Sequence, residues 1–193
     1  MKKIKKYLFL ISLLLLGVLF GIIFINIISE VDKLIIKNEL NEFISLINKN
    51  EISISSSFLN AFSENIIMFF IIWCSGFIFI LLPISYFIVF YKGFITGFLL
   101  SSLIYIFKIK GLFYFLIFVF PTEILSILFL IFFVFIISKF SKKFLLIIYK
   151  DNSYDLKKLI KKYFLLLIGV IIICIILSLL EIFLNYFLIK TFI

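Results

Sequence analysis

Long apolar runs constrain this chain more than any other feature of its sequence. Five stretches continue for 15 or more residues with at most one charge, and a helix of roughly 20 apolar residues can cross the hydrocarbon layer of a bilayer. The mean hydropathy of +1.35 excludes an ordinary soluble fold. We therefore expect an all-α, polytopic membrane protein, built as a single integral membrane domain over residues 1–193.

The apolar runs predict five transmembrane helices and two polar segments. The first run is longer than the ~7 to 15 residues of a cleaved signal peptide core, so we interpret it as an uncleaved span. The outer segment 29–64 carries apolar residues at spacings of three and four from Val31 to Ile47, which is typical of an amphipathic helix, and then a predicted loop over 48–57. A basic cytoplasmic loop is expected at 138–162. The expected spans are 7–28, 65–91, 93–107, 112–137 and 163–180.

The positions of the lysines predict the orientation. All 19 basic residues are lysines, and with the N-terminus inside, the inner segments hold 13 of them and the outer segments six. The positive-inside rule then places the N-terminus in the cytoplasm and the C-terminus outside. We expect short interfacial helices in the basic loop, on the anionic inner leaflet of the lipid bilayer. The net charge of +9 is explained by this topology and does not require a nucleic acid as partner.

Lys92 is the only charge between Asn65 and Phe107. This stretch has 43 residues, which is too long for one crossing and suits two. We predict that Lys92 marks the cytoplasmic turn between the second and third spans, and that Pro83 kinks the second span. The alternative is a functional charge inside the fold. The turn leaves the third span, 93–107, only about 22 Å long.

Two pairs of glycines lie inside predicted spans at a spacing of four. They are Gly17 with Gly21 in the first span and Gly93 with Gly97 in the third. Glycines at this spacing let a second helix backbone approach closely. The spacing fits helix packing within the chain and also a homo-oligomer, and both readings stay open here.

The sequence offers few groups for catalysis. It has no histidine and no Gly-rich phosphate loop, and Cys74 and Cys174 are isolated in apolar runs. We therefore expect no catalytic, cofactor-binding or metal-binding residues, and a protein that is not an enzyme. A membrane-embedded hydrolase would have to use Glu123 and Glu181, which lie on different predicted helices.

Glu123 lies near the middle of the fourth span, where an isolated charge costs at least about 2.5 to 3.5 kcal/mol. It could fix helix packing, relay a proton or substrate, or contact a partner. Pro121 leaves the carbonyl of Ile117 without its usual helical donor, and the hydroxyl of Thr122 or a protonated Glu123 could fill that gap. Glu181 lies near the predicted outer boundary.

The stretch GFIFILLPISYFIVFYKGFITGFLLSSLIYIFKIKGLFYFLIFVFPTEIL combines these features. It has an apolar span with a proline, a Lys-Gly turn with a second glycine four residues on, a glycine that opens the next span, and an intramembrane proline. In this order it resembles the membrane core of the stage II sporulation protein M family. The matching positions are Pro83, Lys92, Gly93, Gly97, Gly111 and Pro121.

The resemblance implies a multi-pass protein of the cell membrane that acts in the mother-cell membrane during engulfment in endospore formation. It also implies a scaffold for peptidoglycan remodelling, whose partners are the peptidoglycan-degrading stage II sporulation proteins D and P. An alternative from the residues alone is the permease subunit of a transporter driven by a separate ATPase. In that case Glu123 would line a path, and the segment 138–162 would hold a coupling helix.

Overall fold

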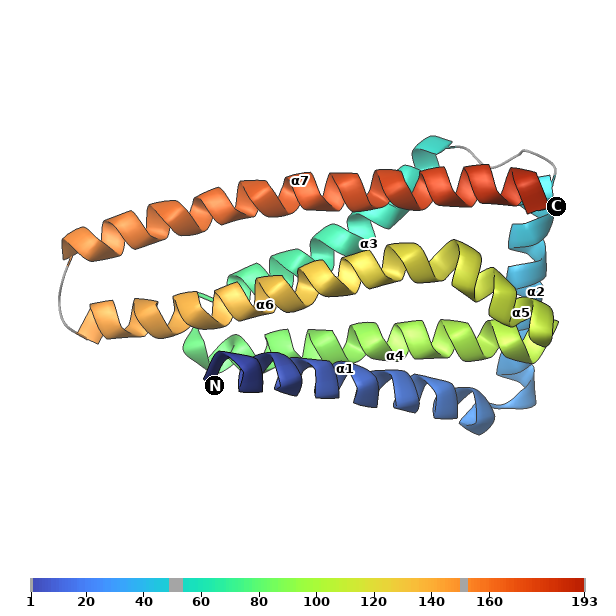
Figure 1. The fold of residues 1–193 in the computed structure, drawn as a ribbon, viewed down its shortest axis with the longest axis horizontal. Coiled ribbons are helices and arrows are strands. Elements are labelled where there is room, and N and C mark those ends of the chain that lie inside the picture. The colour runs from blue at the N-terminus through green and yellow to red at the C-terminus, as the bar shows by residue number, and fades with distance from the viewer. Residues whose placement is uncertain (1, 49–53, 150–152, 193) are drawn as a thin grey trace.

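The computed structural model describes residues 2–48, 54–149 and 153–192, and every regular element in these ranges is a helix (Figure 1). Five helices in the described ranges are long and apolar enough to cross a membrane. The prediction of an all-α protein with five spans is therefore confirmed. The candidate spans are Ile4–Ile27, Ser55–Ser75, Phe79–Phe107, Phe120–Tyr149 and Leu156–Leu184.

The long helices form one elongated bundle. Helix α1 (Lys2–Ile27) lies along α4 (Leu82–Phe107), and both run in the same direction (Figure 1). Helices α3 (Ile54–Ser75), α6 (Phe120–Tyr149) and α7 (Ser153–Phe192) complete the bundle, with α7 in contact with α3 and α6. Helix α1 begins at one end of the bundle and α7 ends at the other (Figure 1).

Helix α2 (Glu30–Asn48) confirms the amphipathic helix expected in the outer segment. Its start is fixed by Ser29, whose Oγ accepts a hydrogen bond from the backbone N–H of Asp32 at 3.2 Å. Glu30 and Asp32 add negative charge in the first turn, where the helix dipole favours it. Helix α2 crosses one end of the bundle at a steep angle to the spans (Figure 1).

The boundary between the second and third spans was predicted wrongly. Helix α3 ends at Ser75, a short 3-10 helix η1 covers Phe79–Leu81, and α4 then continues through Lys92 without a break. Pro83 lies in the first turn of α4, where its missing N–H costs nothing because that position has no intrahelical acceptor. Pro83 therefore starts a helix and does not kink one.

The new boundary between the second and third spans also changes the limits of the neighbouring segments. The third span gains the residues before Lys92, and the 26 residues of α4 reach roughly 39 Å, which is long enough to cross the bilayer. Helix α3 takes up residues 54–64, which were predicted as loop and outer segment. The part of that loop at 49–53 lies outside the described residues.

The fourth span begins after a break at Lys108, whose φ of 54° separates α4 from α5 (Ile109–Tyr114). The predicted spans 93–107 and 112–137 leave residues 108–111 outside a helix, but Gly111 is already helical. A Cβ atom at Gly111 would overlap the backbone carbonyl of Leu103. Glycine at this position therefore lets α5 fold back closely against the end of α4.

A π-helix, η2 (Phe115–Val119), joins α5 to α6. Pro121 follows directly, and because it has no N–H it cannot complete a regular α-helical ladder there. The N–H of Phe120 donates instead to the carbonyl of Phe115, five residues back. The hydroxyl of Thr122, one of the two groups considered for the carbonyl of Ile117, donates instead to the carbonyl of Val119 at 2.9 Å.

The basic segment 138–162 is not a loop of short interfacial helices. Helix α6 continues to Tyr149 and α7 already begins at Ser153, so the two form a hairpin that extends past the start of α1 (Figure 1). Phe140 of α6 stacks on Tyr163 of α7 with ring centroids 3.6 Å apart. Because the two helices pack against each other here, both extend into the segment 138–162, which its lysines had suggested to be a loop.

Candidate functional site

The four predicted packing glycines meet in one interface between α1 and α4. A Cβ atom at Gly17 or Gly21 would overlap a backbone carbonyl of α4, and one at Gly93 or Gly97 would overlap a backbone carbonyl of α1. The two backbones are therefore in direct contact. These glycines pack within the chain in the structure, on the surface that a glycine-mediated homo-oligomer would use.

Lys92 lies on a different face of α4 and is 8% exposed. Its Nζ lies 2.9 Å from Oε1 of Glu123 on α6, and the hydroxyl of Thr96 donates to Oε2 of the same carboxylate at 3.1 Å. Lys92 and Thr96 are four residues apart, so one helix face presents both groups to the acid. The prediction of a turn at Lys92 is wrong, and the alternative of a charge inside the fold describes this residue.

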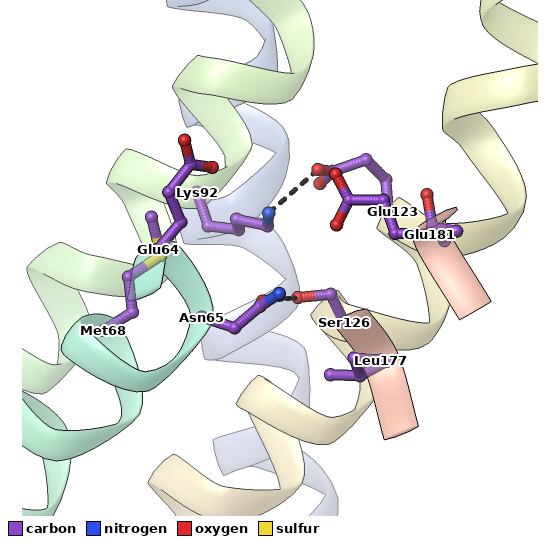
Figure 2. Close-up of a pocket in the computed structure, with 9 residues that line it drawn as sticks. Glu64, Asn65, Met68, Lys92, Glu123, Ser126, Leu177 and Glu181 are labelled. Carbon is purple, nitrogen blue, oxygen red and sulfur yellow. Dashed lines mark hydrogen bonds and ion pairs between the residues drawn. The ribbon is translucent and has the colours of Figure 1, made fainter. Parts of the chain in front are cut away.

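Two further acids face this ion pair. Glu64 of α3 and Glu181 of α7 line the same small pocket as Lys92 and Glu123, so that four helices contribute one charged side chain each (Figure 2). The pocket has a volume of about 30 Å³, enough for one or two water molecules. Glu64 was predicted in the outer segment and instead lies inside the candidate span Ser55–Ser75, whereas Glu181, predicted near the outer boundary, lies close to the end of the span Leu156–Leu184.

Uncharged polar groups complete the wall of the pocket. Ser126 lies one turn after Glu123 and donates to Oδ1 of Asn65 at 3.4 Å, and the amide of Asn65 donates to the carbonyl of Ala61 at 2.9 Å. Asn65 and Ser126 are both buried. The bond between Ser126 and Asn65 joins α3 to α6 one helical turn away from the ion pair that joins α4 to α6 (Figure 2).

The pocket contains three carboxyl groups and one ammonium group. Glu64 and Glu181 form no ion pair in the part of the chain that the structure describes. If all four groups were ionised, the site would carry two surplus negative charges, which is costly within a bilayer. A proton, a small cation or a cationic side chain could each balance that charge.

The pocket is too small for an organic cofactor, because ligand sites commonly measure about 300 to 1,000 Å³. Among the described residues, no three His, Cys, Asp or Glu side chains are arranged to hold a metal ion. Cys74 and Cys174 are both free thiols. The chemistry that this arrangement supports is charge pairing and hydrogen bonding between helices.

Sequence reasoning singled out Lys92 and Glu123 but did not pair them, and it missed Thr96, Asn65 and Ser126. A usable signal was present in the helical spacing. Thr96 follows Lys92 by four residues and Ser126 follows Glu123 by three, so each pair shares a helix face. Polar pairs at this spacing inside apolar runs indicate faces that turn away from lipid.

The fold and the pocket define a class of protein, a polytopic helical membrane protein with a charged pocket inside its spans. The family model described as Stage II sporulation protein M matches residues 10–185. The chain therefore belongs to that family and is a sporulation-related membrane protein, as the resemblance had implied. No curated protein and no solved structure matches the chain.

Proposed function

We propose that this protein is a non-enzymatic membrane anchor that holds peptidoglycan-degrading partners during engulfment. The partners proposed are stage II sporulation proteins D and P, in the mother-cell membrane. The observation that supports this best is α2, a helix outside the spans that presents apolar residues to its surroundings. Val31, Leu34 and Ile35 are each about half exposed or more, and an apolar patch of this kind is typical of an interaction site.

Helix α2 is attached to the bundle without being buried in it. The ammonium of Lys33 lies 5.5 Å from the ring centroid of Tyr105, near the end of α4, and Glu30 pairs with Lys33 at 2.7 Å. Ile36 and Leu40 are only partly buried. A helix held at a fixed place, with apolar side chains still exposed, is suited to bind a second protein.

The lysine distribution supports an outward position for α2. With Lys92 inside a span, the end of the bundle where α1 begins holds 11 lysines of the described residues and the other end holds five. The positive-inside rule then favours α2 on the outer, wall-facing side. Partners that act on peptidoglycan would meet α2 on that side.

The test is a change of the exposed apolar residues alone. The variant V31S/L34S/I35S should lose co-purification with tagged partner proteins and should stop engulfment, because it removes the apolar surface and leaves the spans intact. The matched control N38S/N41S changes exposed polar residues of the same helix and should behave as wild type. Retained binding and engulfment in V31S/L34S/I35S would remove α2 from the proposal.

The charged pocket favours one alternative, a permease subunit in which Glu123 lines a path. Substitution of Glu123 by Gln separates the two functions: an anchor should still recruit its partners, whereas a relay should lose transport. The volume of about 30 Å³ leaves room for water but not for a larger solute. This size supports the anchor.

A further inference from the structure

Three lysines from two helices converge where α1 begins. Lys142 and Lys139 of α6 are the charged groups that act on Lys6 of α1. The contact between α1 and α6 holds them there, with Tyr7 stacked on Phe135 at 4.3 Å between ring centroids. We call Lys6, Lys139 and Lys142 the lysine cluster.

Nothing in the described part of the chain neutralises this cluster. The acids whose side chains are described lie on α2, across the other end of the bundle, or in the charged pocket (Figure 1). The ion pairs among the described residues involve Lys33 and Lys92 only. Ammonium groups that are brought together repel one another. The arrangement therefore favours an anion between them.

The lysine cluster lies near one end of the spans, because Lys6 is two residues from the start of the candidate span Ile4–Ile27 and precedes Tyr7. The ammonium of Lys139 lies 3.9 Å from the centroid of the Phe135 ring, next to the Tyr7 stack. Tyrosine and tryptophan concentrate at the level of the lipid headgroups.

From this geometry we propose that Lys6, Lys139 and Lys142 form a binding site for the phosphate headgroup of an anionic phospholipid. The phosphate oxygens would accept hydrogen bonds from ammonium groups on two helices and would cancel their repulsion. A basic pocket between transmembrane helices at the headgroup level suits this ligand. The site would join the start of α1 to the hairpin of α6 and α7, and it does not depend on the anchoring function.

The test uses the full-length protein, purified in detergent and stripped of lipid. Phosphatidylglycerol and phosphatidylcholine are titrated separately, and bound lipid is counted by native mass spectrometry. The variants are K6Q/K139Q/K142Q and a control of equal charge change, K157Q/K158Q/K161Q, on exposed lysines of α7. Circular dichroism establishes that each variant keeps its helix content.

We expect wild type to bind phosphatidylglycerol and to show no comparable binding of phosphatidylcholine. Each lysine that contacts the phosphate contributes about fivefold in affinity, so K6Q/K139Q/K142Q should lose about 100-fold. The control lysines lie outside the lysine cluster, so their loss should cost less than about fivefold. If the triple variant does not fold, K142Q alone should lose about fivefold by the same reasoning.

Three results would overturn the site. They are equal binding of both lipids by wild type, undiminished binding of phosphatidylglycerol by the cluster variants, and a loss in the control as large as that in K6Q/K139Q/K142Q. A fourth arm adds inorganic phosphate without lipid. If phosphate raises the Tm of wild type as much as phosphatidylglycerol does, the site takes a free anion and the assignment to lipid is wrong.

Discussion

The two faces of α4 are built on opposite principles. The face toward α1 has Gly93 and Gly97 in backbone contact with the facing helix, whereas the face toward α6 has Lys92 and Thr96 bonded to a carboxylate. Close backbone packing stabilises the first face, and an ion pair with a hydrogen bond stabilises the second. The comparison teaches that helices in lipid, which gain no hydrophobic drive from association, can be fixed by close packing or by polar pairing.

The two faces should therefore fail in different ways. A residue that adds volume should disturb the packed face, because its contacts are with backbone atoms that cannot move aside. A residue that removes a partner should disturb the charged face, because a lone buried charge is costly. The following substitutions test this, with the free energy of unfolding in mixed micelles as the common measurement.

The largest effect is expected for Lys92→Met. This change leaves the Glu123 carboxylate part-buried without its cation, and loss of one partner of a buried pair costs about 3 to 5 kcal/mol. The double variant K92M/E123M should recover most of the loss, because it leaves no unpaired charge. The exposed Lys37→Met serves as control and should have little effect. A double variant as unstable as K92M would show that the two residues are not coupled.

The next effect is expected for Gly97→Ala on the packed face. The added methyl group would overlap the carbonyl of Val18, and overpacking of this kind costs about 1 to 3 kcal/mol. Gly169→Ala in α7 is the matched control, because a Cβ there meets nothing within 4 Å. G169A should be neutral or stabilising by up to about 1 kcal/mol. Equal losses in both variants would contradict the close approach of α1 and α4.

Thr96→Val should have a smaller effect on the charged face. The single hydroxyl proton of Thr96 is shared between the Glu123 carboxylate at 3.1 Å and the carbonyl of Lys92 in its own helix at 2.9 Å. Hydrogen bonds to charged groups contribute about 1.5 kcal/mol or more, so the loss should be at most about 1.5 kcal/mol. Thr122→Val is the control, since that hydroxyl donates only to a carbonyl of its own helix in the described structure. If T122V costs as much as T96V, the bond across the helices adds nothing.

The smallest effect is expected for Ser101→Ala on the packed face. The Ser101 hydroxyl is 3.5 Å from the carbonyl of Gly21 and also donates within α4 to Phe98 at 3.0 Å. Hydrogen bonds between membrane helices average about 0.6 kcal/mol, and this one is long. If S101A loses more stability than T96V, polar bonding matters more on the face toward α1 than on the face toward α6, and the comparison of the two faces is wrong.

The features that sequence predicts here are those set by local composition. Five apolar helices, the amphipathic helix α2 and the glycine pairs depend on residues close in sequence, and each is present in the structure. The Ser29 cap at the start of α2 is also visible in the sequence as a serine three residues before an acid.

The features that sequence did not predict depend on partners far along the chain. Glu64 and Lys92 were taken as signs of aqueous segments because each charge was weighed alone. Lys92 is instead paired with a residue 31 positions away, and Glu64 faces the same pocket. A hydropathy pattern does not show that a charge is paired with a residue far along the chain. The predicted boundary between the second and third spans was therefore placed at Lys92, whereas the structure has it at residues 76–81.

The central claim is that Lys92 lies inside a span and that the chain turns near Ile80. Labelling of single cysteines with a membrane-impermeant maleimide, after replacement of Cys74 and Cys174 by Ala, tests this directly. The account predicts that Ile80→Cys, at an exposed position of the turn, is labelled from the side of the membrane where α1 begins, and that Tyr91→Cys is protected. Labelling of Tyr91→Cys with protection of Ile80→Cys would return the turn to Lys92 and contradict the charged pocket.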